Sequence, residues 1–225
     1  MEEILRYFPS LSALQIERFE ALKALYDEWN ARINVISRKD MDAFYEHHVL
    51  HSLSLAIPME GMVAAGDSIL DLGTGGGFPG IPLAIIFEGC EFVLCDSIGK
   101  KTRVAAAVAE ALKLDNVTVV NDRAENLGRS FDWVVSRAVT SLDKMLPWIK
   151  GRWDKGVLYL KGGDIDEEID RCISRRFFDP RMLSVIDVSD FFKEEWFQEK
   201  KIVIIKRLNL YISKRLFTFA LPKSE

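Results

Sequence analysis

The sequence predicts an α/β fold whose mostly parallel sheet of seven strands follows a cap of helices. Three observations predict it. From residue 67 onward, short runs of β-branched and aromatic residues alternate with helical stretches, which is the rhythm of parallel strands joined by right-handed crossovers. A glycine-rich turn directly follows the first such run, at residues 68–72. Near the N-terminus, apolar residues recur at the spacing of an amphipathic helix.

The N-terminal helical cap is predicted to cover residues 1–60. Its first helix presents an apolar face at three- and four-residue spacing, formed by Phe19, Leu22, Tyr26, Trp29 and Ile33. A second helix is expected over residues 39–56, ending before Pro58, because proline interrupts the hydrogen bonds of a helix interior.

The core is predicted to span residues 67–206, with a helix over residues 100–114. Strands are expected at residues 68–72, 92–96, 117–120, 133–136, 157–160, 182–188 and 203–205. Because no internal repeat or linker-like stretch interrupts the chain, we expect a single domain over residues 1–225. Residues 207–225 form a tail to which the sequence assigns no role.

Composition narrows the class of protein. The 225 residues are 48% hydrophobic, enough for a substantial core, and no apolar run is long enough to span a bilayer. The start lacks the features of a secretory signal, and the three cysteines form no C-x-x-C pair. We therefore expect a cytoplasmic protein with reduced thiols, no membrane partner and no metal. A monomer is expected since no interface motif stands out. The net charge of −4 does not by itself suggest a nucleic-acid partner.

The strongest motif is the stretch from Asp71 to Gly80, with sequence DLGTGGGFPG, which lies between a predicted strand and a predicted helix. Such a loop can hold the pyrophosphate of a nicotinamide cofactor or the nucleoside of S-adenosylmethionine. An acid two residues before the first glycine, Asp71, suits the cationic S-adenosylmethionine and would sit poorly beside a pyrophosphate. Asp96 ends the second strand, where a carboxylate can bind both ribose hydroxyls. Singly, each acid is also explained as a turn or strand-end carboxylate.

A set of motifs resembles the 16S rRNA guanine-N7 methyltransferase family, also called glucose-inhibited division protein B. In chain order they are the loop with its G-G-G-F-P-G-I-P stretch, D-S-I-G-K-K from Asp96, R-A-E from Arg123, S-R-A from Ser136 and L-K-G from Leu160. The match also includes W-N-x-x-I-N from Trp29 and covers about residues 20–206. The resemblance implies a Rossmann-like class I methyltransferase that uses S-adenosylmethionine.

The resemblance also implies which residues bind the cofactor. It places Gly73, Phe78, Ala124, Glu125 and Arg137 at the cofactor, with Ala124 and Glu125 at the adenine and Arg137 near the methyl-donating end. Together with the loop and strand-end residues, the expected cofactor site comprises Asp71, Gly73, Gly75, Gly77, Phe78, Asp96, Ser97, Ala124, Glu125 and Arg137.

The stretch after the fourth strand helps to select the chemistry. Ser136-Arg137-Ala138 stands where enzymes that methylate exocyclic amines carry an Asn/Asp-Pro-Pro-aromatic turn. Methylation of pyrimidine C5 needs a cysteine nucleophile, and Cys95 is better explained as part of a strand. Guanine N7 already has an exposed lone pair, so we predict no general base and assign Arg137 and Lys161 positioning and electrostatic roles.

Basic residues supply the predicted contacts with 16S rRNA or the 30S particle. Lys100, Lys101 and Arg103 crowd the start of a helix, where cations oppose the helix dipole, and Arg123 follows the third strand. Solvated charge explains the helix residues equally well. A small-molecule methyltransferase and a non-catalytic ribosome-assembly factor remain alternatives. His47 and His51, four residues apart, could share a metal, but no third ligand is evident. The role of His47, His48 and His51 therefore stays open.

Overall fold

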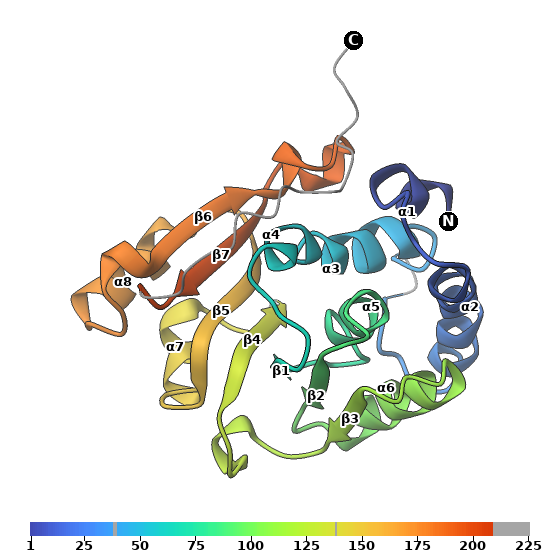
Figure 1. Cartoon of the computed structure of the whole chain (residues 1–225), viewed down its shortest axis with the longest axis horizontal. Helices are drawn as coiled ribbons and strands as arrows, with labels where there is room; N and C mark the ends of the chain where they lie inside the picture. The colour runs from blue at the N-terminus through green and yellow to red at the C-terminus, as the bar shows by residue number, and fades with distance from the viewer. Residues whose placement is uncertain (38–39, 138, 209–225) are drawn as a thin grey trace.

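Seven strands form one sheet in the computed structural model, which describes residues 1–37, 40–137 and 139–208 (Figure 1). The order is β3-β2-β1-β4-β5-β7-β6. The strands are β1 (Ser68–Leu72), β2 (Glu91–Cys95), β3 (Val117–Val120), β4 (Phe131–Arg137), β5 (Trp153–Gly162), β6 (Leu183–Asp187) and β7 (Lys200–Lys206). The first five are parallel, while β7 runs antiparallel to both β5 and β6. The predicted mostly parallel, seven-stranded fold is confirmed.

Helices connect and cover these strands. The α-helices are α1 (Glu2–Tyr7), α2 (Ala13–Asn30), α3 (His51–Leu53), α4 (Ala56–Glu60), α5 (Gly80–Ile86), α6 (Gly99–Ala111), α7 (Leu142–Trp148) and α8 (Asp166–Ser174). The chain also forms a π-helix, η1 (Tyr45–Leu50), and the 3-10 helices η2 (Ala124–Asn126), η3 (Pro180–Met182), η4 (Val188–Asp190) and η5 (Glu195–Phe197). Within the described part of the chain, no helix is long and apolar enough to cross a membrane. The motif residue Ala138 and the predicted tail from residue 209 onward lie outside the described residues.

The cap differs from its prediction in detail. The second predicted helix is a π-helical turn, η1, that continues into α3, and Pro58 lies inside α4 instead of ending a helix before it. Pro58 is tolerated because it is the third residue of α4, where a backbone N–H has no intrahelical acceptor. The long helix α2 begins with a capping box: Ser12 and Gln15 each accept a hydrogen bond from the other's backbone N–H.

Alternate strand residues supply two cores, one on each face of the sheet. In Figure 1, α7 and α8 lie on one face and α1 to α6 on the other. The core under the cap joins Phe19, Leu22 and Tyr26 of α2 to strand residues such as Ile69 and Trp133. Their strand neighbours, which point the other way, pack on α7 and α8. The cap is therefore continuous with the sheet's core.

Strand order reverses at β1, and this determines where a ligand can bind. The chain passes from β1 outward to β2 and β3, then returns to the other side of β1 with β4. In open parallel sheets, the loops beyond the carboxyl ends of such strands diverge and leave a crevice. The glycine-rich loop follows β1 at this point.

Substitution of Gly156 tests how closely β5 packs against its neighbouring strands. A β-carbon there would lie 2.7 Å from the ring of Trp133 and 2.8 Å from the backbone oxygen of Ile205. We expect Gly156→Ala to lower the free energy of unfolding by about 1–3 kcal/mol through overpacking, measured by urea denaturation. Gly128→Ala is the control, because a β-carbon at Gly128 meets no atom within 4 Å. Equal stability of the two variants would contradict this packing.

Candidate active site

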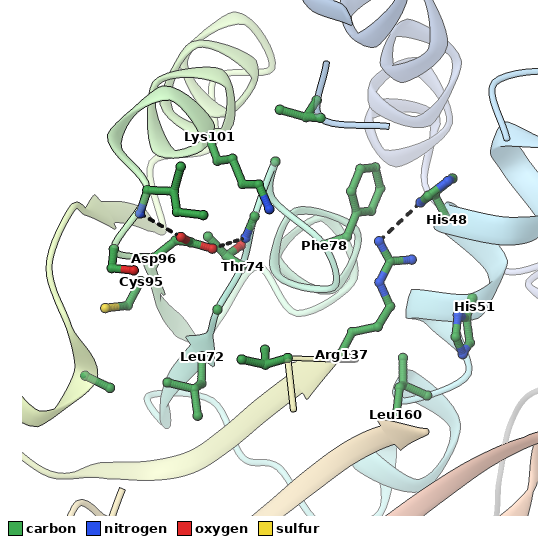
Figure 2. Close-up of a pocket in the computed structure, with 18 of the residues that line it drawn as sticks. His48, His51, Leu72, Thr74, Phe78, Cys95, Asp96, Lys101, Arg137 and Leu160 are labelled. Carbon is green, nitrogen blue, oxygen red and sulfur yellow. Dashed lines mark hydrogen bonds between the residues drawn. The ribbon is translucent and has the colours of Figure 1, made fainter. Parts of the chain in front are cut away.

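A cleft of about 870 Å³ opens at the carboxyl ends of the parallel strands. Loops after β1 to β4 and the last residues of β5 line it, together with the histidine segment of the cap (Figure 2). Most of the predicted cofactor-binding residues lie in its wall: Gly73, Gly75, Phe78, Asp96, Ser97, Ala124, Glu125 and Arg137. Two predicted residues, Asp71 and Gly77, do not line the cleft.

Asp71 lies beneath the glycine-rich loop and holds it. Its buried carboxylate accepts hydrogen bonds from the Thr74 hydroxyl at 2.5 Å and from the Gly80 amide at 2.8 Å, both to Oδ2. The other oxygen, Oδ1, is buried with no hydrogen-bond partner. Burial raises the pKa of Asp71 to about 7. In this structure the acid therefore supports the loop from behind, instead of facing the cleft as its position in the motif suggested.

Most amides of the loop are already engaged. Gly73 and Thr74 donate their N–H groups to the Cys95 carbonyl at 2.8 and 3.1 Å, and Gly75 donates to Asp96 Oδ2 at 2.9 Å. The first amide of α5, at Gly80, goes to Asp71. A pyrophosphate is normally held by free amides of such a loop and helix N-terminus. This geometry therefore disfavours a dinucleotide and fits a cofactor without phosphate.

The floor of the cleft is fixed by close contacts. Gly73 has φ +67°, and a β-carbon there would lie 2.4 Å from a methyl group of Val139, so only glycine fits. Asp96 also accepts from the Ile98 amide at 2.8 Å, which directs its carboxylate toward the loop. The Ile98 side chain is 42% exposed in the cleft wall. An apolar side chain beside a carboxylate suits the base and ribose of a nucleoside.

At the other end, Arg137 is held between the cap and the loop. Its guanidinium contacts the His47 carbonyl at 3.3 Å and His48 Nδ1 at 3.2 Å (Figure 2). It also lies 5.1 Å from the centre of the Phe78 ring. Burial lowers the pKa of Arg137 to about 10, so the group stays charged at neutral pH. Burial and this neighbouring cation lower the pKa of His48 to about 3. His48 is therefore neutral and accepts through Nδ1, since a guanidinium can only donate.

The other predicted residues divide between the cleft and its surroundings. Lys161 lines the cleft, but its ammonium pairs with Glu168 at 2.9 Å and donates to the Thr140 carbonyl at 3.2 Å. Of the predicted RNA contacts, Lys101 and Arg123 line the cleft. Lys100 and Arg103 are exposed on α6 outside it.

Two wall residues come from far along the chain and were not predicted. Trp196 of η5 stacks on the His47 ring, with centroids 4.3 Å apart and planes at 15°, and Lys200 lies 4.4 Å above Trp196. Both line the cleft with His51. The histidine run was visible in the sequence, but no local pattern indicates that Trp196 covers it. Among the described residues, no group of three potential metal ligands is arranged around a common point.

Of the three cysteines in the chain, Cys95 is the one that lines the cleft. Its thiol is buried and lies 3.2 Å from the Asp122 carbonyl, to which it donates. Burial raises the pKa of Cys95 to about 11, so little thiolate exists at neutral pH. A covalent mechanism through this thiol is therefore disfavoured.

Comparison with solved structures shows which known fold this chain shares. Magnesium protoporphyrin IX methyltransferase from Synechocystis, solved with bound S-adenosylmethionine, aligns with a TM-score of 0.57 at 16% identity, over 88% of this chain and 98% of that one. An S-adenosylmethionine-dependent methyltransferase from Aquifex aeolicus aligns with a TM-score of 0.53 at 15% identity, over 76% and 98%. The fold is that of the Rossmann-like methyltransferases.

Sequence comparison is more specific. The family model described as rRNA small subunit methyltransferase G, GidB, matches residues 15–187. Ribosomal RNA small subunit methyltransferase G of Flavobacterium psychrophilum is 50% identical over 211 residues, covering 90% of this chain and 96% of that protein. The Porphyromonas gingivalis protein of the same name is 48% identical, over 91% and 92%. The chain belongs to the rRNA small subunit methyltransferase G family, and the resemblance found in its motifs is confirmed.

The raised pKa of Asp71 predicts a pH dependence of stability. An aspartate carboxyl has a pKa of about 3.9 in an unfolded chain, so the folded state favours the protonated form. Its favourable contribution is complete below about pH 4 and is lost as the pH rises through about 7. We expect the free energy of unfolding to fall more between pH 4 and 8 in the native protein than in Asp71→Asn, whose amide cannot ionise. Urea denaturation at each pH measures this, and parallel profiles would refute it.

Proposed function

We propose that this protein transfers a methyl group from S-adenosylmethionine to N7 of a guanine in 16S rRNA. The observation that carries the proposal is one cleft with two ends, one that we assign to the nucleoside of the cofactor and one that is cationic. The first contains Asp96 and the engaged glycine loop, and the second contains Arg137. Membership of the rRNA methyltransferase G family supports the substrate class. In this proposal the protein works as a cytoplasmic monomer on rRNA or the 30S particle.

The residues fit the cofactor without further groups. In this proposal Asp96 binds the ribose hydroxyls, Ile98 covers a face of the adenine, and Ala124 and Glu125 contact its edge; all four line the cleft. S-adenosylmethionine, when bound, supplies an electrophilic methyl group. Asp71 does not touch this cofactor in our proposal. It keeps the loop in the conformation that leaves room for the nucleoside.

The cationic end is suited to a nucleotide that needs no proton removed. Guanine N7 presents its lone pair in the ring plane, so the protein has only to hold the base in line with the methyl group. The contacts of Arg137 with His47, His48 and Phe78 fix the direction of its guanidinium. A fixed guanidinium can hold a phosphate or the guanine carbonyl oxygen. Lys161 is neutralised by Glu168, so its role in this proposal is to position the Thr140 segment.

The decisive test is methyl incorporation from labelled S-adenosylmethionine into 16S rRNA and 30S particles from a strain that lacks the enzyme. We expect labelled 7-methylguanosine in at least one of these substrates. Cofactor binding without label in any RNA would instead favour a small-molecule substrate or a non-catalytic assembly role.

Arg137→Lys tests the cationic end in the same assay. Lysine keeps the charge but cannot span the His47 carbonyl and His48 Nδ1, so misalignment should lower kcat roughly a hundredfold. Cofactor affinity should change much less, because the contacts with Asp96 and the loop remain. An unchanged kcat would show that Arg137 does not help to align the reacting groups.

Asp96→Asn tests the nucleoside end. The amide retains an oxygen for the Gly75 N–H but loses the charge and one acceptor, so we expect S-adenosylmethionine affinity to fall about tenfold. Isothermal titration measures this. Asp122→Asn is the control, because this carboxylate lines the same cleft with one oxygen satisfied by Arg123 N and Asn126. Equal losses in both variants would contradict a specific role for Asp96.

A further inference from the structure

A second groove lies at the opposite end of the sheet from the cationic end of the cleft. It encloses about 400 Å³ between the end of α7, the start of β5, the segment after α8 and the residue after β7. Trp153 lines it at the start of β5, whereas Leu160 and Lys161 line the cleft near the end of the same strand. At ~3.3 Å per residue, the two sites are separated by roughly 20–25 Å along β5.

The lining combines positive charge with aromatic rings. Its charged residues are all cations, namely Lys150, Arg175, Arg176 and Arg207. Its aromatic residues are Trp153, Phe177 and the largely buried Phe178. Phe177 is 36% exposed, one of few large apolar side chains so exposed among the described residues. Four cations in one small groove contrast with a chain whose net charge is −4.

The charges of the groove are only partly used within the protein. Arg175 pairs with Asp143 at 3.4 Å. The Arg207 guanidinium lies 5.3 Å from the centre of the Trp153 ring and donates to the backbone carbonyl of Trp153. Within the described residues, Lys150 and Arg176 take part in no ion pair. Both side chains belong to exposed residues at the rim. They are free to pair with an anion from outside.

We propose that this groove binds a single-stranded segment of the RNA substrate, away from the methylated guanine. Cations along a groove neutralise phosphates, and aromatic side chains stack on bases without regard to sequence, which together suit single-stranded nucleic acid. An acidic protein surface is the competing partner, and comparing naked rRNA with 30S particles in the test below separates the two. The inference rests on the proposed function for the identity of the RNA, and it adds a contact surface that the methyl-transfer cleft does not contain.

The test measures binding of naked 16S rRNA by the full chain, using filter binding over a series of salt concentrations. In Lys150→Glu/Arg176→Glu we expect affinity to fall about tenfold or more and the log–log salt slope to become shallower by about 1.4, for two single-strand phosphate contacts. Phe177→Ala should lower affinity about fivefold or more with the slope unchanged. Lys113→Glu/Lys193→Glu is the control with the same change in net charge, at two exposed lysines outside both cavities.

Equal weakening by the charge variant and its control would overturn the inference, as would native affinity in both groove variants. Weaker binding to 30S particles with unchanged binding to naked rRNA would also overturn it, and would assign the groove to a ribosomal protein. The methylation assay separates this outcome from failure of the proposed function. The charge variant should raise KM for rRNA while kcat and cofactor affinity stay native. If the native protein binds rRNA through the groove but does not methylate it, the proposed methylation is wrong and the proposed RNA contact at the groove is still supported.

Discussion

The buried carboxylate of Asp71 is the constraint on which the site depends. Through one oxygen it joins the Thr74 hydroxyl to the first amide of α5, so the loop and the helix keep one geometry. The Tyr26 hydroxyl donates to the Gly76 carbonyl at 2.7 Å and secures the same loop from the side of the cap. Loop amides that would otherwise face a ligand are thereby used inside the protein. This internal bonding leaves few loop amides to hold a phosphate.

The N-terminal cap is part of the site, not an addition to it. Tyr26 of α2 contacts the loop, Phe44 packs against Tyr26 and Phe78, and the η1 turn brings His48 to Arg137. These contacts cross from the first quarter of the chain to strand β4. The cationic end of the cleft would lose its orientation if the cap shifted, because two partners of Arg137 belong to η1.

Much of the fold and part of the site could be predicted from the sequence. Strand runs and the glycine loop are local signals, so β1 to β5 and the positions of Gly73 and Asp96 followed from short stretches. Asp71 shows the limit: its spacing from the glycines indicated a carboxylate at the loop, but not that it bonds from behind. The stacking of Trp196 on His47 joins residues about 150 positions apart, and no periodicity reports such a contact. The predicted helix end before Pro58 was wrong because the effect of a proline depends on its position within a helix, and the sequence does not show where α4 begins.

The direction of β7 determines how a long, flexible substrate could reach the cleft and the groove at once. Because this strand runs against its neighbours, its first residue, Lys200, lies at the cleft and the residue after it, Arg207, lies at the groove. Hydrogen bonds to β5 along its length make the strand a rigid spacer. The distance between the cleft and the groove is therefore fixed by the length of β7. A substrate that engages both ends must present its two segments at a set interval, so shape as well as sequence would decide which guanine arrives at the cleft.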